Sequence, residues 1–133
     1  EFELFDNGKC SIWLMCMRAG TSTSLHCHQR KDAAFMPLTD GVTFKTLAGT
    51  EVLSEYLSVE KGAFHAQENN SDHDVYFLEY EWPSEKGDLV RAEDRYGRVG
   101  AGYEGTEHMM PLKQWISRSV LPPGIREMVR EVA

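Results

Sequence analysis

Residues 74–82 read DVYFLEYEW and form the longest β-type run of the chain. Aromatic and aliphatic residues dominate it, it shows no helical period, and Pro83 ends it, because proline cannot donate to a sheet. Successive side chains of a strand point to opposite faces. One face of this run therefore carries the odd-numbered residues 75 to 81, and the other carries the even-numbered residues 76 to 82.

Shorter β-type runs precede it, separated by turns that contain Gly or Asp. They are residues 11–17, 24–28, 33–38, 42–47, 51–53 and 56–59. Strands with a turn every 8–12 residues or so, without helical segments between them, are typical of an antiparallel sandwich or barrel. The sequence therefore predicts an all-β barrel.

The C-terminal third of the chain has a different pattern. Residues 84–110 are rich in Gly, charge and Tyr, and we expect irregular chain that wraps the barrel, so that the barrel domain covers residues 1–110. In residues 111–133, apolar side chains recur at helical spacing, at Ile125, Met128, Val129 and Val132. This pattern predicts short C-terminal helices, which pack on the barrel or on a partner.

Composition excludes several classes of partner. The chain has 133 residues and a net charge of −7, which argues against nucleic-acid binding. No apolar run reaches the roughly 18–20 residues of a membrane span. Three cysteines, Cys10, Cys16 and Cys27, cannot all pair with one another and indicate free thiols of a reducing compartment. We therefore expect a cytoplasmic protein.

Two histidines stand two positions apart. Residues 24–28 read SLHCH, so His26 and His28 project from the same face of the predicted strand. Adjacent imidazoles repel one another when protonated, and a shared divalent metal is a common reason for the pair. Two ordinary polar strand residues are the alternative that this spacing leaves open.

A third histidine, His65, makes the pattern specific. The chain has Gly20, five residues, His26-Cys27-His28 and later Gly41; it then has Gly62, two residues, His65, three residues and Asn69. This arrangement resembles the two motifs of the cupin superfamily, over roughly residues 10–82. The resemblance implies a double-stranded β-helix barrel with a divalent metal, such as Fe, Zn, Mn or Ni, held by His26, His28 and His65.

The glutamate of the first cupin motif has no clear counterpart. It would fall at Asp32 or Ala33, or at Ala34 when counted back from Gly41. Asp32 is a fourth ligand only if the strand shifts register. Otherwise three neutral imidazoles hold the metal and leave positions open for water or substrate.

Four other residues are candidates for the chemistry. Arg30 and Lys31 directly follow the histidine pair, at a strand end near the barrel mouth, where they would bind an anionic substrate. In the run 74–82, the face that lines the barrel decides between two residues. If the odd face points inward, Glu79 is a candidate general base with a pKa raised by burial; if the even face does, Tyr80 is the inward polar group.

The resemblance implies three functions that the sequence does not separate. The first is a metal-dependent isomerase or epimerase that acts on a small anionic molecule, such as a sugar phosphate or a sugar or hydroxy acid in carbohydrate metabolism. The second is a three-histidine iron dioxygenase. The third is a non-catalytic cupin module that binds a sugar or another effector within a larger protein. Cupins are often dimers, and the apolar face of the predicted C-terminal helix fits a homodimer.

Overall fold

The computed structural model describes residues 1–85 and 87–93 of the chain. In this part the chain forms strands and no helix. The strands are β1 (Phe2–Asp6), β2 (Ser11–Met17), β3 (Leu25–Cys27), β4 (Asp32–Pro37), β5 (Val42–Thr46), β6 (Gly49–Val52), β7 (Leu57–Val59), β8 (His65–Asn69), β9 (Val75–Trp82) and β10 (Val90–Glu93). Accordingly, the described residues contain no helix with the length and apolarity needed to cross a membrane.

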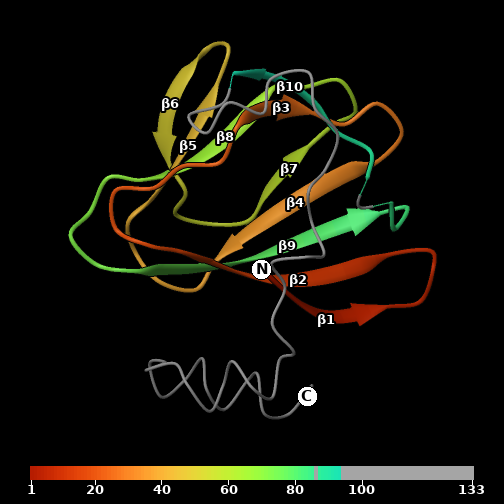
Figure 1. The fold of residues 1–133 in the computed structure, drawn as a ribbon, viewed down its shortest axis with the longest axis horizontal. Coiled ribbons are helices and arrows are strands. Elements are labelled where there is room, and N and C mark those ends of the chain that lie inside the picture. Colours follow the sequence, from red (N-terminus) through yellow and green to blue (C-terminus); the bar gives the residue numbers. More distant parts are fainter. Residues whose placement is uncertain (86, 94–133) are drawn as a thin grey trace.

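The strands form two five-stranded sheets that face each other (Figure 1). One sheet has the order β1-β2-β9-β4-β7, and the other has the order β10-β3-β8-β5-β6. The pairings are antiparallel, and strands far apart in sequence become neighbours. The double-stranded β-helix architecture that the sequence predicts is therefore confirmed.

The structure corrects one part of the strand prediction. Residues 84–110 were expected to be irregular throughout, but residues 90–93 form β10, which pairs with β3. The reason is long-range pairing, because β3 offers a free edge to which residues 90–93 can bind. The sequence of this short segment shows no strand pattern from which the pairing could be predicted. The predicted helical extension 111–133 lies outside the described residues.

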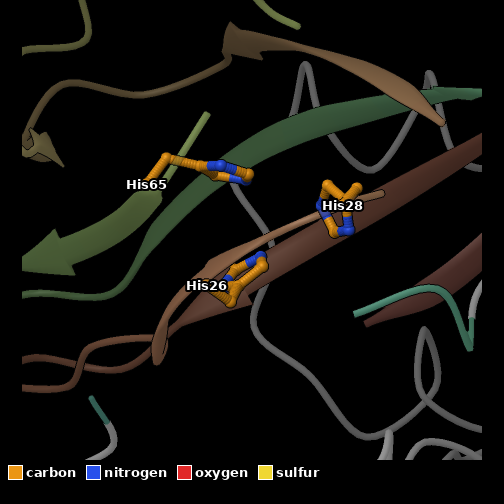
Figure 2. A group of neighbouring side chains, drawn as sticks. All are labelled: His26, His28 and His65. Atoms are coloured by element: carbon orange, nitrogen blue, oxygen red, sulfur yellow. The ribbon is translucent and has the colours of Figure 1, made fainter. Parts of the chain in front are cut away.

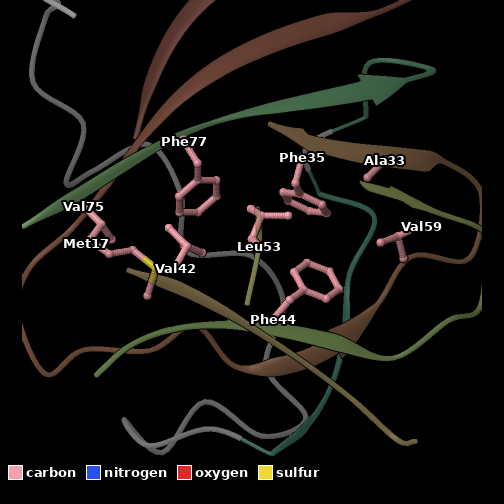
Figure 3. Close-up of a cluster of buried hydrophobic side chains, with 9 residues drawn as sticks. All are labelled: Met17, Ala33, Phe35, Val42, Phe44, Leu53, Val59, Val75 and Phe77. Atoms are coloured by element: carbon pink, nitrogen blue, oxygen red, sulfur yellow. The ribbon is translucent and has the colours of Figure 1, made fainter. Parts of the chain in front are cut away.

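The main hydrophobic core fills the space between the two sheets (Figure 3). Phe35 on β4 and Phe77 on β9 come from one sheet, and Val42 and Phe44 on β5 come from the other. The rings of Phe35 and Phe44 lie 5.3 Å apart between their centroids, and those of Phe35 and Phe77 lie 6.2 Å apart. Because Phe77 is in this core, the odd face of β9 points into the barrel.

The even face of β9 packs in a second cluster on the outer side of its sheet. Tyr76 and Leu78 are buried there with Phe2 and Leu14, and the half-buried Tyr80 packs against the same cluster. The inward-facing alternative for Tyr80 is therefore wrong. Val75 and Phe77, on the opposite face of β9, are the residues that pack in the main core. Of the two conditional candidates, Glu79 is the one that faces the barrel.

Candidate metal centre

Sheet pairing brings the three predicted ligands together. His26 on β3 lies directly opposite His65 on β8, and His28 follows one residue after the end of β3. The ring centroids lie 4.5 Å apart for His26 and His65, 5.0 Å for His26 and His28, and 5.2 Å for His28 and His65. Figure 2 shows the three rings gathered in one place. All three side chains are buried.

Each ring is fixed by a backbone carbonyl. Nδ1 of His26 lies 2.7 Å from the carbonyl oxygen of Ser24, Nδ1 of His28 lies 2.6 Å from that of Asp88, and Nδ1 of His65 lies 2.9 Å from that of Ala63. A carbonyl oxygen only accepts, so each Nδ1 carries the proton and donates it. The lone pair of each neutral ring is therefore at Nε2, which is the tautomer a metal ligand needs.

The remaining ring nitrogens fit a metal ion. One ligand nitrogen from each ring lies within 4.8 Å of the others, and among the described residues these three histidines are the only group of this kind. Nε2 of His28 and Nε2 of His65 are buried and have no hydrogen-bond partner in that part of the chain. Such atoms cost free energy unless something binds them. A divalent cation accepts three imidazole nitrogens and would satisfy them together.

Burial and positive charge keep the rings neutral. Burial is the main cause that lowers the pKa of all three, to about 4 for His28 and well below the ordinary value for His26. The ammonium of Lys31 lowers the pKa of His28 and His65 further, and the Arg91 guanidinium does so for His26. At neutral pH the rings therefore need lose no proton before they bind a metal.

Asp88 is a functional residue that the sequence analysis missed. Its carbonyl accepts the N–H of His28, and its carboxylate accepts the backbone N–H groups of Gln29, Arg30 and Lys31 at 3.2, 2.7 and 3.0 Å. Burial opposes ionisation of Asp88, but these three donors outweigh it and hold its pKa below the ordinary value. Asp88 thus fixes both a ligand ring and the turn behind it.

Lys31 lies inside the barrel and not at its mouth. Its side chain is 1% exposed, and its Nζ lies 2.9 Å from Oε1 of Glu81, which is equally buried. Oε2 of Glu81 accepts from the hydroxyl of Ser11 at 3.4 Å, and that hydroxyl accepts from Nε1 of Trp13 at 3.0 Å. The expected position was wrong because Lys31 continues the inward alternation of Ala33 and Phe35 on β4.

Two other candidates lie away from the three rings. Arg30 is exposed and pairs with Glu85, donating from Nε at 2.9 Å and also from Nη2. Asp32 accepts the backbone N–H of Lys61 at 3.1 Å and does not belong to the ligand group. The first motif therefore supplies no carboxylate ligand, and the described centre consists of three imidazoles.

Solved structures of other proteins share this architecture. An uncharacterized conserved protein with a double-stranded β-helix domain from Klebsiella pneumoniae superposes with a TM-score of 0.60, at 13% identity over 69% of this chain and 77% of that one. A sugar phosphate isomerase of the cupin superfamily from Silicibacter pomeroyi gives 0.56, at 18% identity over 65% and 58% of the two chains. A cupin domain from Bordetella pertussis gives 0.51, at 24% identity over 60% and 88%.

The chain has the cupin fold. Comparison by sequence finds no matching protein-family model and no matching curated protein. At these identities the likeness concerns the architecture, and the chemistry has to be derived from the residues of this chain.

In this cupin barrel the last residue of the second motif has a structural role. The amide of Asn69 donates to the carbonyls of Met17 and His73 at 3.0 and 2.7 Å, and its Oδ1 accepts from Ser71. Gly62, with φ of 77°, allows the turn before β8, and its N–H donates to the carbonyl of His28 at 2.7 Å. Gly62 therefore ties the turn before β8 to His28, and Asn69 ties the end of β8 to β2 and to the turn before β9.

Two further charged residues of the barrel, Glu81 and Arg91, are not among the site residues that the sequence predicts. Glu81 was seen only as a member of the odd face, and its role depends on Lys31, which lies 50 positions earlier. Arg91 is buried opposite His26 in the pairing of β10 with β3. No local pattern signals either one, because each acquires its place from strand pairing.

The three-histidine group adjoins a cavity of ligand size. A cavity of about 400 Å³ is lined by His65, the Phe44 ring that stacks on it, and Phe64, together with residues of β7 and the β5–β6 turn. Small-molecule sites in proteins measure about 300–1,000 Å³. The volume fits a small molecule.

Proposed function

We propose that the chain is a metal-dependent enzyme of the isomerase or epimerase type that acts on a small anionic substrate, such as a sugar or hydroxy acid or a sugar phosphate. The convergence of one ring nitrogen from each of His26, His28 and His65 carries this proposal. A divalent metal bound there would polarise substrate oxygens and acidify a C–H bond next to a carbonyl. Among the solved neighbours, the Silicibacter protein is named a sugar phosphate isomerase, which supports this class.

The residues of the chain divide the remaining work. The carbonyls of Ser24, Ala63 and Asp88 hold the rings in the ligand tautomer. The ammonium of Lys31 attracts the anionic group of the substrate to the interior. Glu79, buried on the inward face of β9, is the proposed base that moves the proton. Arg30 acts at the outer surface, where it orders Glu85 beside Asp88.

The proposal is tested by metal content and proton exchange. The protein is purified without chelators, its metals are measured, and the protein loaded with Zn²⁺, Mn²⁺ or Ni²⁺ is incubated in D₂O with a panel of hydroxy acids, keto acids and sugar phosphates. Incorporation of deuterium next to a carbonyl, followed by NMR, is the expected result. His26→Ala should abolish metal binding and exchange, whereas His73→Ala, at an exposed histidine, should leave both unchanged.

Bound metal without any exchange would contradict the isomerase assignment. Absence of metal, with ligand binding that His26→Ala leaves unchanged, would instead indicate a non-catalytic binding module.

One observation favours oxygen chemistry as a second candidate. The ligand group found among the described residues contains three neutral imidazoles and no carboxylate. Such a site holds Fe²⁺ and leaves positions for O₂ and a substrate. Protein reconstituted with Fe²⁺ would then consume oxygen in the presence of substrate, and the Zn²⁺ form would not. Oxygen uptake is therefore the measurement that separates the two candidates.

A further inference from the structure

Gln67 presents a buried hydrogen-bond donor inside the barrel. It lies two positions after His65 on β8, so it faces the same side of the sheet, and its side chain is buried. Its Oε1 accepts from the hydroxyl of Thr23 at 3.1 Å, while its Nε2 has no hydrogen-bond partner among the described residues. A buried amide N–H without a partner is costly. This donor indicates a ligand that brings an acceptor oxygen.

Lys31 presents further donors. An ammonium group has three N–H bonds. In the described part of the chain, the Lys31 ammonium has one acceptor, Oε1 of Glu81 at 2.9 Å, although the side chain is 1% exposed. The interior around the rings therefore offers N–H donors from Lys31 and Gln67, and the complementary ligand brings acceptor oxygens, as an oxyanion does.

The side chain of Lys31 points into the barrel, toward the candidate metal centre. Its backbone N–H and the ring of His28 are both bonded to Asp88, one at the carboxylate and the other at the carbonyl. Its side chain continues the inward face of β4, on which the Phe35 ring lies 5.6 Å from the ring of His65. Lys31 therefore lies on the same inner side of the barrel as the three rings.

The charge of Glu81 restricts which oxyanion fits. Glu81 already neutralises one charge at Lys31, and a second anion beside it experiences repulsion that grows with its own charge. A singly charged carboxylate is therefore favoured over a doubly charged phosphate. The guanidinium of Arg30, whose fork suits phosphate, is turned to the outer surface and engaged by Glu85.

The aromatic rings around His65 restrict the size of the ligand. Phe35 and Phe44 pack against His65 with centroid distances of 5.6 and 5.7 Å, and both belong to the main core. Beside this apolar wall, the polar groups that a ligand can meet include Lys31, Gln67 and a metal held by the ring nitrogens. A ligand that meets all three groups is compact and carries its oxygens close together.

We propose that the substrate is a small monocarboxylate with an oxygen on the neighbouring carbon, an α-hydroxy or α-keto acid, whose carboxylate accepts N–H groups of Lys31. Glu81, backed by Ser11 and Trp13, is a positioning residue that holds the ammonium in place. This inference rests on the proposed metal-dependent function, because the same ligand would also have to reach the metal that the three ring nitrogens hold.

Ligand binding to the Co²⁺-loaded protein tests the inference without any turnover. The visible spectrum of bound Co²⁺ reports ligands, and the probes are glycolate as the monocarboxylate, inorganic phosphate as the competing anion and imidazole as a neutral ligand. Wild type should bind glycolate at least about tenfold more tightly than phosphate. Lys31→Met should lower the affinity for glycolate by about tenfold or more and leave the affinity for imidazole unchanged. It should also raise the affinity for Co²⁺, because a positive charge near the metal is lost. Lys61→Met removes an exposed ammonium and should change none of these values.

In Lys31→Met, the affinities for Co²⁺ and for glycolate should change in opposite directions. Such a result indicates that Lys31 binds the ligand, because a purely structural defect would lower both affinities. If Lys31→Met does not fold, the double variant Lys31→Met with Glu81→Gln removes both charges of the pair. In it glycolate binding should still weaken, because the ammonium N–H donors are lost, while Co²⁺ affinity should stay close to that of wild type, because the net charge is unchanged. Unchanged glycolate affinity in these variants, or tighter binding of phosphate than glycolate by wild type, overturns the inference while the metal centre stands. Failure of Co²⁺ to bind, or Co²⁺ binding that His26→Ala leaves intact, overturns the proposed function and this inference with it.

Discussion

The ring of His28 and the main chain of Asp88 are joined by a hydrogen bond of 2.6 Å, across 60 positions of sequence. The carboxylate of the same aspartate collects three backbone N–H groups of the turn after His28. One residue between β9 and β10 therefore sets both the tautomer of a ligand and the path of the chain that leads to Lys31.

Asp88→Asn should destabilise the protein and weaken metal binding. An asparagine has one acceptor oxygen where the carboxylate has two, and its own N–H₂ would face backbone donors. Loss of a residue that orients a metal ligand typically lowers metal affinity by about 10–100-fold. Zn²⁺ affinity from competition with a chelating dye, together with urea unfolding, measures both effects. Glu85→Gln, at a more exposed acid nearby, is the matched control, and an equal loss in that variant would contradict the role of Asp88.

Metal should stabilise the folded chain through the three rings. A ligand at a hundredfold excess over its Kd raises the free energy of unfolding by about 2.7 kcal/mol when it binds only the folded state. We expect Zn²⁺ to do so for wild type but not for His65→Ala, which removes one of the three ring nitrogens. Thermal unfolding with and without Zn²⁺ gives the difference. His73→Ala should behave as wild type, and stabilisation of His65→Ala by Zn²⁺ would argue against the site.

The metal-free protein should lose stability in mild acid. The unfolded His28 ring binds a proton with a pKa of about 6.5, whereas burial and then Lys31 lower the pKa of the folded ring to about 4. Between these values the unfolded state holds more protons, so the stability present above pH 6.5 or so falls as the pH drops toward 4. When the pH falls from about 7.5 to about 5, protonation linked to His28 alone should lower the free energy of unfolding by about 2 kcal/mol.

Urea unfolding in the presence of a chelator measures this pH dependence. His26 and His65 add to it with the same sign, because burial lowers their pKa as well. The exposed His73 has a raised pKa, owing to its hydrogen bond with Asp72, and contributes with the opposite sign. His73→Ala should therefore keep the acid loss. A stability that is flat over this interval would show that the rings are not buried in their neutral form.

The buried ion pair should show strong coupling between its partners. Lys31→Met leaves the Glu81 carboxylate without its 2.9 Å partner and should cost about 3–5 kcal/mol of unfolding free energy. The double variant Lys31→Met with Glu81→Gln leaves no uncompensated charge from the pair and should cost less than Lys31→Met alone. A double-mutant cycle by urea unfolding measures the coupling. Additive losses would indicate that Lys31 and Glu81 act independently.

The grouping of the three histidines was predictable because its signals are local. The side-chain period of a strand places His26 and His28 on one face, and the spacing from Gly62 through His65 to Asn69 marks the second segment. Alternating runs bounded by turns likewise predicted the all-β barrel and several strand positions, including residues 11–17, which the structure reproduces as β2. These features need no knowledge of which strands become neighbours.

The charges around the trio were decided by the tertiary structure alone. A strand pattern defines two faces but does not say which one meets the core, so it could not choose between Glu79 and Tyr80; packing of Phe77 against Phe35 made that choice. The pairing of β9 with β4 brought Glu81 to Lys31, and the chain after β9 brought Asp88 to His28. The sequence determined the three histidines because the spacing of His26 and His28 is a property of a single strand and His65 has a local spacing pattern of its own. The groups that orient and charge the centre depend instead on contacts between segments that only the closed barrel brings together.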